Sequence, residues 1–221
     1  MSILTLEHVK YQYHGADDYA VKEATSSFEL GKLYAIMGPS GSGKSTLLAI
    51  LAGLDEPTEG TIFFEKIALK DLDLDRYRRE DISMVFQAFH LFPLLTVLEN
   101  VCFPLDLLGV EKRASRERAK HLLLRVGIQE EQFKRFPSHL SGGEQQRVAI
   151  ARSLASGARV ILADEPTGNL DGENTQKIID ILTSLARDEG YCIIIVTHDM
   201  DVAGRADVVL RMKDGILIRD T

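Results

Sequence analysis

The stretch that decides the fold is Gly38–Thr46, which reads GPSGSGKST. Its glycines, lysine and serine match the phosphate-loop pattern G-x-x-x-x-G-K-S/T at every fixed position. Glycine lets the backbone bend so that several N–H groups point into one concavity, which suits a polyanion. We therefore predict that a nucleotide's phosphates are cradled by Gly38, Pro39, Ser40, Gly41, Ser42, Gly43, Lys44, Ser45 and Thr46.

The residues on either side of this loop support the same interpretation. The apolar run Leu33–Met37 (LYAIM) predicts a buried strand, and LLAILAG predicts a helix that begins near Lys44 and ends at Gly53. The positive end of that helix faces the same anion. Lys44 is expected on the β- and γ-phosphates, and the Ser45 hydroxyl is expected to ligate Mg²⁺. A chance glycine turn is the alternative, and the strand before it and the helix after it argue against that.

The composition is that of an ordinary soluble globular protein. The chain has 221 residues, of which 45% are apolar and 27% charged, enough for one large or two small domains. The net charge of -7 argues against a general nucleic-acid-binding surface. Cys102 and Cys192 lie in apolar surroundings and are expected to pack as small hydrophobes. Because the sequence shows neither a signal peptide nor an apolar run of about 18–20 residues, we expect a cytosolic chain whose membrane role needs a partner.

Upstream of the loop, residues 3–13 and 20–30 read as strands. The aromatic Tyr13 could stack on a purine base, although such a residue is more often packed at a strand edge. Downstream, we expect a short strand at 61–64, a helix with a solvated face at 71–81, and a buried strand at 82–86 that leads directly into Gln87.

Residues 88–110 form the most apolar region outside the strands, and two interpretations stay open. They could form the core of a small helical subdomain. Alternatively, Phe89, Leu91, Phe92 and Leu94 could form an exposed docking patch for a partner. Residues 112–126 show helical periodicity, with Ala119, Leu122, Leu123 and Val126 as the buried stripe.

The segment Leu140–Arg147 reads LSGGEQQR and precedes a predicted helix. Ser141, Gly142 and Gly143 again place a serine and backbone N–H groups at a helix N-terminus, where an anion is favoured. Taken alone, this pattern could be an ordinary N-cap. Its combination with a phosphate loop makes a second nucleotide-binding element the better interpretation.

Two acids end the apolar run Arg159–Pro166 (RVILADEP). Ligands of open α/β sheets bind at the carboxyl ends of strands, so Asp164 is expected near Mg²⁺ and Glu165 near the attacking water. Alternation along an extended chain predicts that the two side chains point to opposite sides. His198 follows another buried run, Cys192–Val196, and is a candidate for a phosphate contact. An amphipathic helix is expected between them, at 174–187.

Together, the phosphate loop, LSGGEQQR and the strand ending in Asp-Glu closely resemble the ATP-binding-cassette (ABC) ATPases. The resemblance covers the chain from Tyr13 to His198 in the family's order. The runs LDEPTEG, VFQAFHLFPLLTVLENV and ADEPTGNLD look most like the macrolide-export and lipoprotein-release branch (MacB, LolD), where Glu144 commonly replaces the signature glutamine. Peptide-resistance ATPases and the cell-division protein FtsE are near neighbours.

The resemblance implies an α/β fold: a P-loop NTPase core of the ABC type with an antiparallel β-subdomain and a helical subdomain inserted at about residues 88–157. The whole chain, 1–221, would be one nucleotide-binding domain. The cofactors would be ATP and Mg²⁺. Tyr13 would stack on adenine; Ser45 and Gln87 would ligate Mg²⁺, with Asp164 behind them. Glu165 would polarise the attacking water, and His198 would contact the γ-phosphate.

The resemblance also implies partners. Ser141, Gly142 and Gly143 would complete the site on a second copy, so that ATP holds a homodimer together, with Asp171 at the interface. A separate transmembrane permease would place the chain at the inner face of the cell membrane, with or without a periplasmic or extracellular adaptor, for export or extraction of a peptide, lipoprotein or drug. A signalling ATPase of the FtsE kind is one alternative. A soluble DNA-repair or ribosome-associated cassette is another, and the acidic charge argues against it.

Overall fold

The fold is organised around a mixed sheet. In the computed structural model, which describes residues 2–219, the strand order is β5-β4-β1-β2-β10-β9-β3-β8-β7-β6. The strands are β1 Ser2–Tyr11, β2 Val21–Glu29, β3 Lys32–Met37, β4 Glu59–Phe64, β5 Ile67–Ala68, β6 Ile82–Phe86, β7 Val160–Asp164, β8 Cys192–Thr197, β9 Val208–Lys213 and β10 Ile216–Arg219. The helices are α1 Lys44–Leu51, α2 Leu74–Arg76, α3 Val97–Leu107, α4 Lys112–Arg125, α5 Gly142–Ala155, α6 Gly172–Arg187 and α7 Met200–Ala203.

The sheet has a parallel part and an antiparallel part. Strands β6, β7, β8, β3 and β9 run parallel, whereas β2, β1, β4 and β5 pair antiparallel. The carboxyl ends of β3, β7 and β8 therefore meet at one edge, where register places Met37 beside Thr197 and Asp164 beside Val196. The loops that follow these ends carry the predicted site residues. This arrangement confirms the predicted α/β fold.

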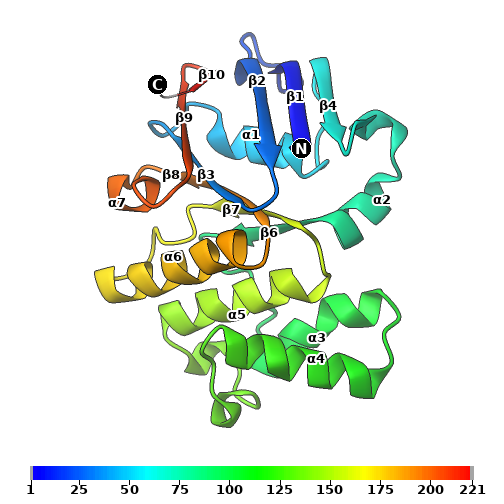
Figure 1. Cartoon of the computed structure of the whole chain (residues 1–221), viewed down its shortest axis with the longest axis vertical. Coiled ribbons are helices and arrows are strands. Elements are labelled where there is room, and N and C mark those ends of the chain that lie inside the picture. The colour runs from blue at the N-terminus through cyan, green and yellow to red at the C-terminus, as the bar shows by residue number, and fades with distance from the viewer. Residues whose placement is uncertain (1, 220–221) are drawn as a thin grey trace.

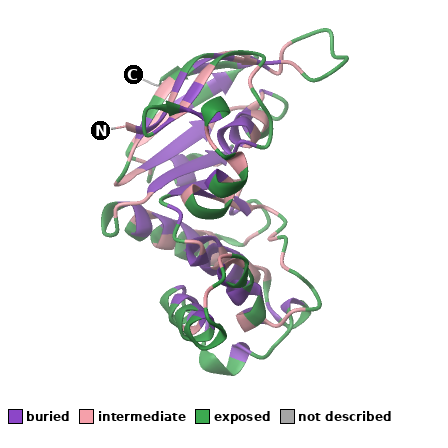
Figure 2. Ribbon diagram, turned by 90° about the vertical axis from the view of Figure 1, so that its right-hand side faces the viewer, coloured by how far each residue is buried: buried purple, intermediate pink, exposed green. Residues whose placement is uncertain are grey.

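The parallel strands are buried on both faces, and their side chains alternate between two cores. In β8, Cys192 and Ile194 pack in one core with helix α1, whereas Ile193 and Ile195 pack in the other with α3–α6. Near-continuous apolar runs are typical of such strands. The view in Figure 1 shows the antiparallel strands and α1 at one end of the molecule and α3, α4 and α5 at the other. In Figure 2 the strands and the inward sides of the helices are buried while the outer helix faces are exposed.

Both cysteines are free thiols, and each belongs to a different core. Cys192 lies in β8 in the core that contains α1, and Cys102 lies in α3 in the core that contains α5. Burial raises the pKa of Cys192 to about 12 and also raises the pKa of Cys102. The prediction that the cysteines pack as small hydrophobes is confirmed.

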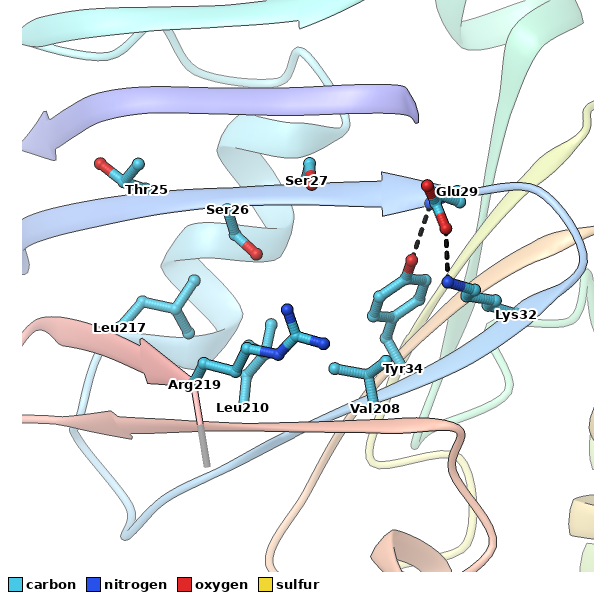
Figure 3. Close-up of a pocket in the computed structure, with 10 residues that line it drawn as sticks. All are labelled: Thr25, Ser26, Ser27, Glu29, Lys32, Tyr34, Val208, Leu210, Leu217 and Arg219. Atoms are coloured by element: carbon cyan, nitrogen blue, oxygen red, sulfur yellow. Dashed lines mark hydrogen bonds and ion pairs between the residues drawn. The ribbon is translucent and has the colours of Figure 1, made fainter. Parts of the chain in front are cut away.

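The two parts of the sheet separate beside β10, which pairs with β2 at the single position Ile216–Glu23. A hollow of about 360 Å³ lies there. Figure 3 shows its lining residues, with β2 on one side and β9 and β10 on the other. At one end of it the main-chain N–H of Glu29 donates to the Tyr34 hydroxyl over 2.8 Å, and Glu29 also pairs with Lys32. Burial raises the pKa of Tyr34 to about 12.

The segment 71–81, expected to be one helix, is instead broken into short turns. A 3₁₀ turn (Leu69–Asp71), α2 and a π turn (Tyr77–Asp81) follow one another. The break has a local cause, because the Asp73 carboxylate accepts from the N–H groups of Asp75 and Arg76 and so starts a new helical turn. Tyr77 is then buried, and its hydroxyl donates to the Leu51 carbonyl over 2.8 Å. Two further 3₁₀ turns, Glu130–Gln132 and Pro137–His139, precede α5.

Helices α3 and α4 form an outlying layer that packs on α5. Thr96 caps α3 through a capping box with Glu99. The predicted stripe of α4 is buried, with Ala119 and Leu123 fully covered. Ahead of α3, Phe92 and Leu94 are exposed by 40% and 87%, whereas Phe89 and Leu91 are half-buried. The region 88–110 thus contributes α3 to the helical core and exposes two of the four proposed docking residues, and docking itself stays a prediction. Within residues 2–219, no helix has the length and apolar character needed to cross a membrane.

Candidate functional site

The loop between β3 and α1 has the geometry of an anion cradle. Gly41 and Gly43 have φ of 78° and 98°, and Gly43 stands at the N-terminus of α1. Packing adds a second requirement for glycine. A Cβ atom on Gly38 would lie 2.1 Å from the Met212 carbonyl oxygen, and one on Gly43 would lie 2.3 Å from that of Ala20. The loop is thus fitted closely against β9 and against Ala20, which precedes β2. It leads into the N-terminus of α1, where the N–H groups of the first turn have no partner within the helix and can bind an anion.

Lys44 is buried with only 6% exposure, and its ammonium donates to the carbonyls of Gly38 and Pro39 over 2.8 and 2.9 Å. These bonds hold the charge within the loop. On the next residue, the Ser45 hydroxyl donates to Asp164 Oδ1 over 3.1 Å. Burial raises the pKa of Asp164, and the bond from Ser45 opposes that rise. A hydroxyl and a carboxylate at the end of the phosphate loop form a set of oxygen donors that suits Mg²⁺.

Tyr13 lies beside the phosphate loop and half of it is exposed. Its hydroxyl is 2.8 Å from Thr46 Oγ1, and its ring is nearly perpendicular to that of Tyr11 at a centroid distance of 4.9 Å. The ring is therefore held by a neighbour while the residue stays accessible. The structure thus brings Tyr13 and the loop residues together, as the sequence predicted for residues sharing a nucleotide.

Glu165 does not follow the alternation expected from an extended strand. Strand β7 ends at Asp164, and Glu165 has a left-handed backbone with φ of 46°. The alternation argument is therefore wrong at this residue, whose direction is set by the turn. A left-handed non-glycine residue costs on the order of 1–3 kcal/mol and is typical of functional sites. The Glu165 N–H donates to the Val196 carbonyl, and Oε1 lies 3.2 Å from His198 Nδ1.

Gln87 is held by a residue that the sequence analysis did not single out. Its amide nitrogen donates to Asn169 Oδ1 over 3.2 Å, and the Asn169 amide returns a bond of 3.3 Å to the Gln87 carbonyl. A Cβ on Gly168 would lie 2.7 Å from Gln87 Nε2 and 3.4 Å from Glu165 Oε2. Gln87, Glu165 and His198 therefore share one neighbourhood. No one-dimensional pattern pairs Asn169 with Gln87, because the bond joins residues 82 positions apart.

The signature segment caps helix α5. The Ser141 hydroxyl accepts from the Glu144 N–H, and the Glu144 carboxylate accepts from the Ser141 N–H and hydroxyl over 2.7 and 2.8 Å. Gln132 adds a further bond to Glu144. Burial acts to raise the pKa of Glu144, but the hydrogen bonds from Ser141 and Gln132 outweigh it and lower that pKa. Glu144 at the signature position thus builds a capping box.

The signature residues lie apart from the phosphate loop within the chain. Helix α1 packs in one core, and α5 packs in the other core on the opposite face of the sheet. The near neighbours of Gly142 and Gly143 are Phe89, Asn169, Leu170 and Asn174. Among the predicted site residues, the structure therefore assembles the phosphate loop, Tyr13, Gln87, Asp164, Glu165 and His198, and it places Ser141, Gly142 and Gly143 at the start of α5, beside the turn that contains Asn169 and Leu170.

This fold and this loop define the class of P-loop nucleoside triphosphatases. The particular family follows from comparison with known proteins: the chain belongs to the ABC transporter family, whose model matches residues 21–168. It is an ABC-type ATPase and the ATP-binding subunit of a transporter. Its relatives include MacB proteins, as the sequence predicted for the branch.

Two kinds of relative are informative. The uncharacterized ABC transporter ATP-binding protein MJ0796 of Methanocaldococcus jannaschii is 43% identical, over 99% of this chain and 96% of its own length. Its dimeric structure bound to ADP and Pi superposes with a TM-score of 0.90 at 41% identity, covering 99% and 97% of the two chains. The macrolide export ATP-binding/permease protein MacB of Shigella flexneri is also 43% identical, but this chain spans only 34% of that longer protein.

Proposed function

We propose that the chain hydrolyses Mg²⁺-ATP between two copies of itself and so drives a separate transmembrane permease. The observation that carries this proposal is that α1, which follows the phosphate loop, and α5, which begins at the signature segment, pack on opposite faces of one sheet. One chain therefore offers each nucleotide only one of its two anion-binding elements. A second copy in the reversed orientation supplies the other, through Ser141, Gly142 and Gly143. The dimeric MJ0796 cassette supports this arrangement.

The residues fit Mg²⁺-ATP. Ser45 and Asp164 already share a hydrogen bond, and with Gln87 they would hold Mg²⁺, which neutralises phosphate charge when bound. Lys44 exchanges its loop carbonyls for phosphate oxygens, and Tyr13 stacks on the base. Glu165 orients and deprotonates the attacking water, and His198, 3.2 Å from that carboxylate, contacts the γ-phosphate. We take residues 1–221 as one nucleotide-binding domain whose helical subdomain covers about 88–157.

A groove beside α3 supports the permease contact. It has a volume of about 360 Å³ between β6 and α3, and its lining includes Phe92, Phe103, Leu107 and Arg152. Arg152 projects from α5 and donates to the carbonyls of Phe89 and His90, which both have positive φ. A partner segment in this groove would therefore act on the loop that follows Gln87 and on the signature helix together. This contact would hold the chain at the inner face of the cell membrane.

The relatives guide the choice of partner and cargo. MacB of Shigella flexneri is an ATP-binding/permease protein, which supports a permease as the partner of this chain. The substrate class is a peptide, lipoprotein or drug that is exported or extracted from the membrane, with or without a periplasmic or extracellular adaptor.

The decisive experiment is Glu165→Gln, which removes the proposed base. We expect this variant to bind ATP but to hydrolyse it about 10²–10⁴ times more slowly, because that is the usual cost of losing a positioned general base. An ATP-bound dimer should then accumulate. Phosphate release and size-exclusion chromatography with and without Mg²⁺-ATP measure both effects. Hydrolysis at the wild-type rate would exclude Glu165 as the base, and a native chain without ATPase activity would overturn the function.

A further inference from the structure

Gly143, in the first turn of α5, faces the first turn of α6 at very short range. A Cβ atom on Gly143 would lie 2.2 Å from the side-chain oxygen of Asn174 and 2.4 Å from its Cγ. Real Cβ atoms essentially never approach another heavy atom within 3.0 Å. Any side chain at position 143 would therefore displace Asn174 or the helix that carries it. Glycine at position 143 thus lets Asn174 keep its observed position.

Asn174 also holds the carboxylate of Asp171, which caps α6. The main-chain N–H of Asn174 donates to Asp171 Oδ1 over 2.8 Å. The side-chain amide nitrogen of Asn174 donates to Asp171 Oδ1 and Oδ2 over 3.1 and 2.9 Å. Because a carboxylate can only accept hydrogen bonds, the amide nitrogen must face Asp171 and the amide oxygen must face Gly143. One half-buried side chain therefore touches both segments.

The contact continues between Gly142, the preceding residue of α5, and the turn that leads into α6. A Cβ atom on Gly142 would lie 3.5 Å from Leu170 Cδ2 and 4.0 Å from the Asn169 carbonyl oxygen, which are ordinary contact distances. The turn that leads into α6 thus lies along the first turn of α5 at two successive positions. The N-termini of the two helices are consequently held side by side.

We infer that Asn174 is a positioning residue that joins the serine-glycine turn of α5 and the Asp171 cap of α6 into one rigid face, which the chain presents to a second copy on ATP binding. The inference rests on the proposed function, because this face matters only if a second copy closes over the nucleotide. The Gly143 N–H stays available to that nucleotide, and only the missing side chain is assigned to Asn174.

The first test is Asn174→Ala in the Glu165→Gln parent, with Gln176→Ala as the matched control. Gln176 lies in the same helix and makes the same kind of amide–carboxylate bond, to Asp180 over 2.7 Å, on the exposed surface. Losing these two intrachain bonds to Asp171 should leave the face less ordered in the monomer, and the cost of ordering it should raise the dissociation constant of the Mg²⁺-ATP dimer about tenfold or more. Sedimentation velocity measures this constant. Binding of a fluorescent ATP analogue by the monomer should stay within about twofold.

The second test is a double-mutant cycle of Gly143→Ala and Asn174→Gly, which measures coupling between two contacting residues. Gly143→Ala alone should weaken dimerisation. In the Asn174→Gly chain, where the clashing atoms are gone, the same change should have little further effect. Thermal melts of all four chains confirm that each is folded.

Three outcomes would overturn the role of Asn174. The first is an equal dissociation constant for the Asn174→Ala chain and its parent. The second is an equal rise in that constant with Gln176→Ala. The third is that Gly143→Ala weakens dimerisation as much in the Asn174→Gly chain as in the parent. A parent that stays monomeric with Mg²⁺-ATP would overturn the proposed dimer as well. A parent that dimerises normally would confine the failure to Asn174.

Discussion

At the scale of a single residue, Lys44 supplies the positive charge of the phosphate loop. Its ammonium is buried and bonded to two loop carbonyls, so it is held close to where phosphate oxygens would replace those carbonyls. We predict that Lys44→Ala lowers ATP affinity by about tenfold or more, because charge-assisted bonds contribute about 1.5–3 kcal/mol each. Titration with a fluorescent ATP analogue measures this. Unchanged affinity would contradict the assigned role.

Glu144 makes the stability of the fold depend on pH through the cap of the signature helix. Its folded pKa lies below the ordinary 4.5, so its hydrogen bonds stabilise the fold above that value, and this contribution disappears as the pH falls through the folded pKa. Glu144→Gln retains a side-chain oxygen for the Ser141 N–H but cannot titrate. We predict that the free energy of unfolding in urea falls less between about pH 7 and about pH 4 in Glu144→Gln than in the native chain.

The control for this prediction is Glu130→Gln, which changes the net charge equally on an exposed turn. The two substitutions should differ in their effect on the pH dependence. If they behave alike, the capping box contributes nothing to it.

At the scale of elements, the groove beside α3 makes the docking hypothesis testable. Phe92 packs on Phe103 with ring centroids 4.6 Å apart and lies under the Arg152 guanidinium at 5.9 Å. We predict that Phe92→Asp leaves ATP-analogue binding by the isolated chain intact but prevents co-purification with the membrane subunit, because a carboxylate would replace apolar contact area. Phe136→Asp is the matched control, since Phe136 is exposed to a similar degree, 42% against 40%, outside this groove. A misfolded Phe92→Asp chain would favour a purely structural role.

Most elements of the fold could be predicted from the sequence, because buried parallel strands leave unmistakable apolar runs. The predicted strand at 82–86 and the predicted buried run at 192–196 agree with β6 and β8 to within one residue. The failures have local causes. Asp73 restarts the helix expected at 71–81, and the turn at Glu165 replaces the extended backbone that the alternation argument needed. The bond between Gln87 and Asn169 and the contact between Gly143 and Asn174 depend on tertiary packing, which no local pattern encodes.

At the scale of the whole molecule, a site shared between two copies can be tested by complementation. A Lys44→Ala chain lacks a functional phosphate loop but has an intact signature, and Ser141→Arg has the reverse defect. We predict that each variant alone is inactive, and that their mixture recovers part of the ATPase activity, because a mixed dimer contains one site with both halves intact. Phosphate release measured against total protein concentration checks this. A mixture as inactive as its components would argue against shared sites.

The labelling rates of the two buried cysteines can report local opening of the chain. A thiol reagent modifies a buried cysteine only when its surroundings open, as in hydrogen exchange, and the cooperative units of a protein can open separately. Cys192 sits in the sheet core with α1, and Cys102 sits in the helical core with α5. Their labelling rates, resolved by mass spectrometry of the peptides, would therefore time the unfolding of each layer independently. Slower labelling of Cys102 alone in the presence of Mg²⁺-ATP would mean that the nucleotide rigidifies the helical layer, and no cysteine has to be introduced to measure it.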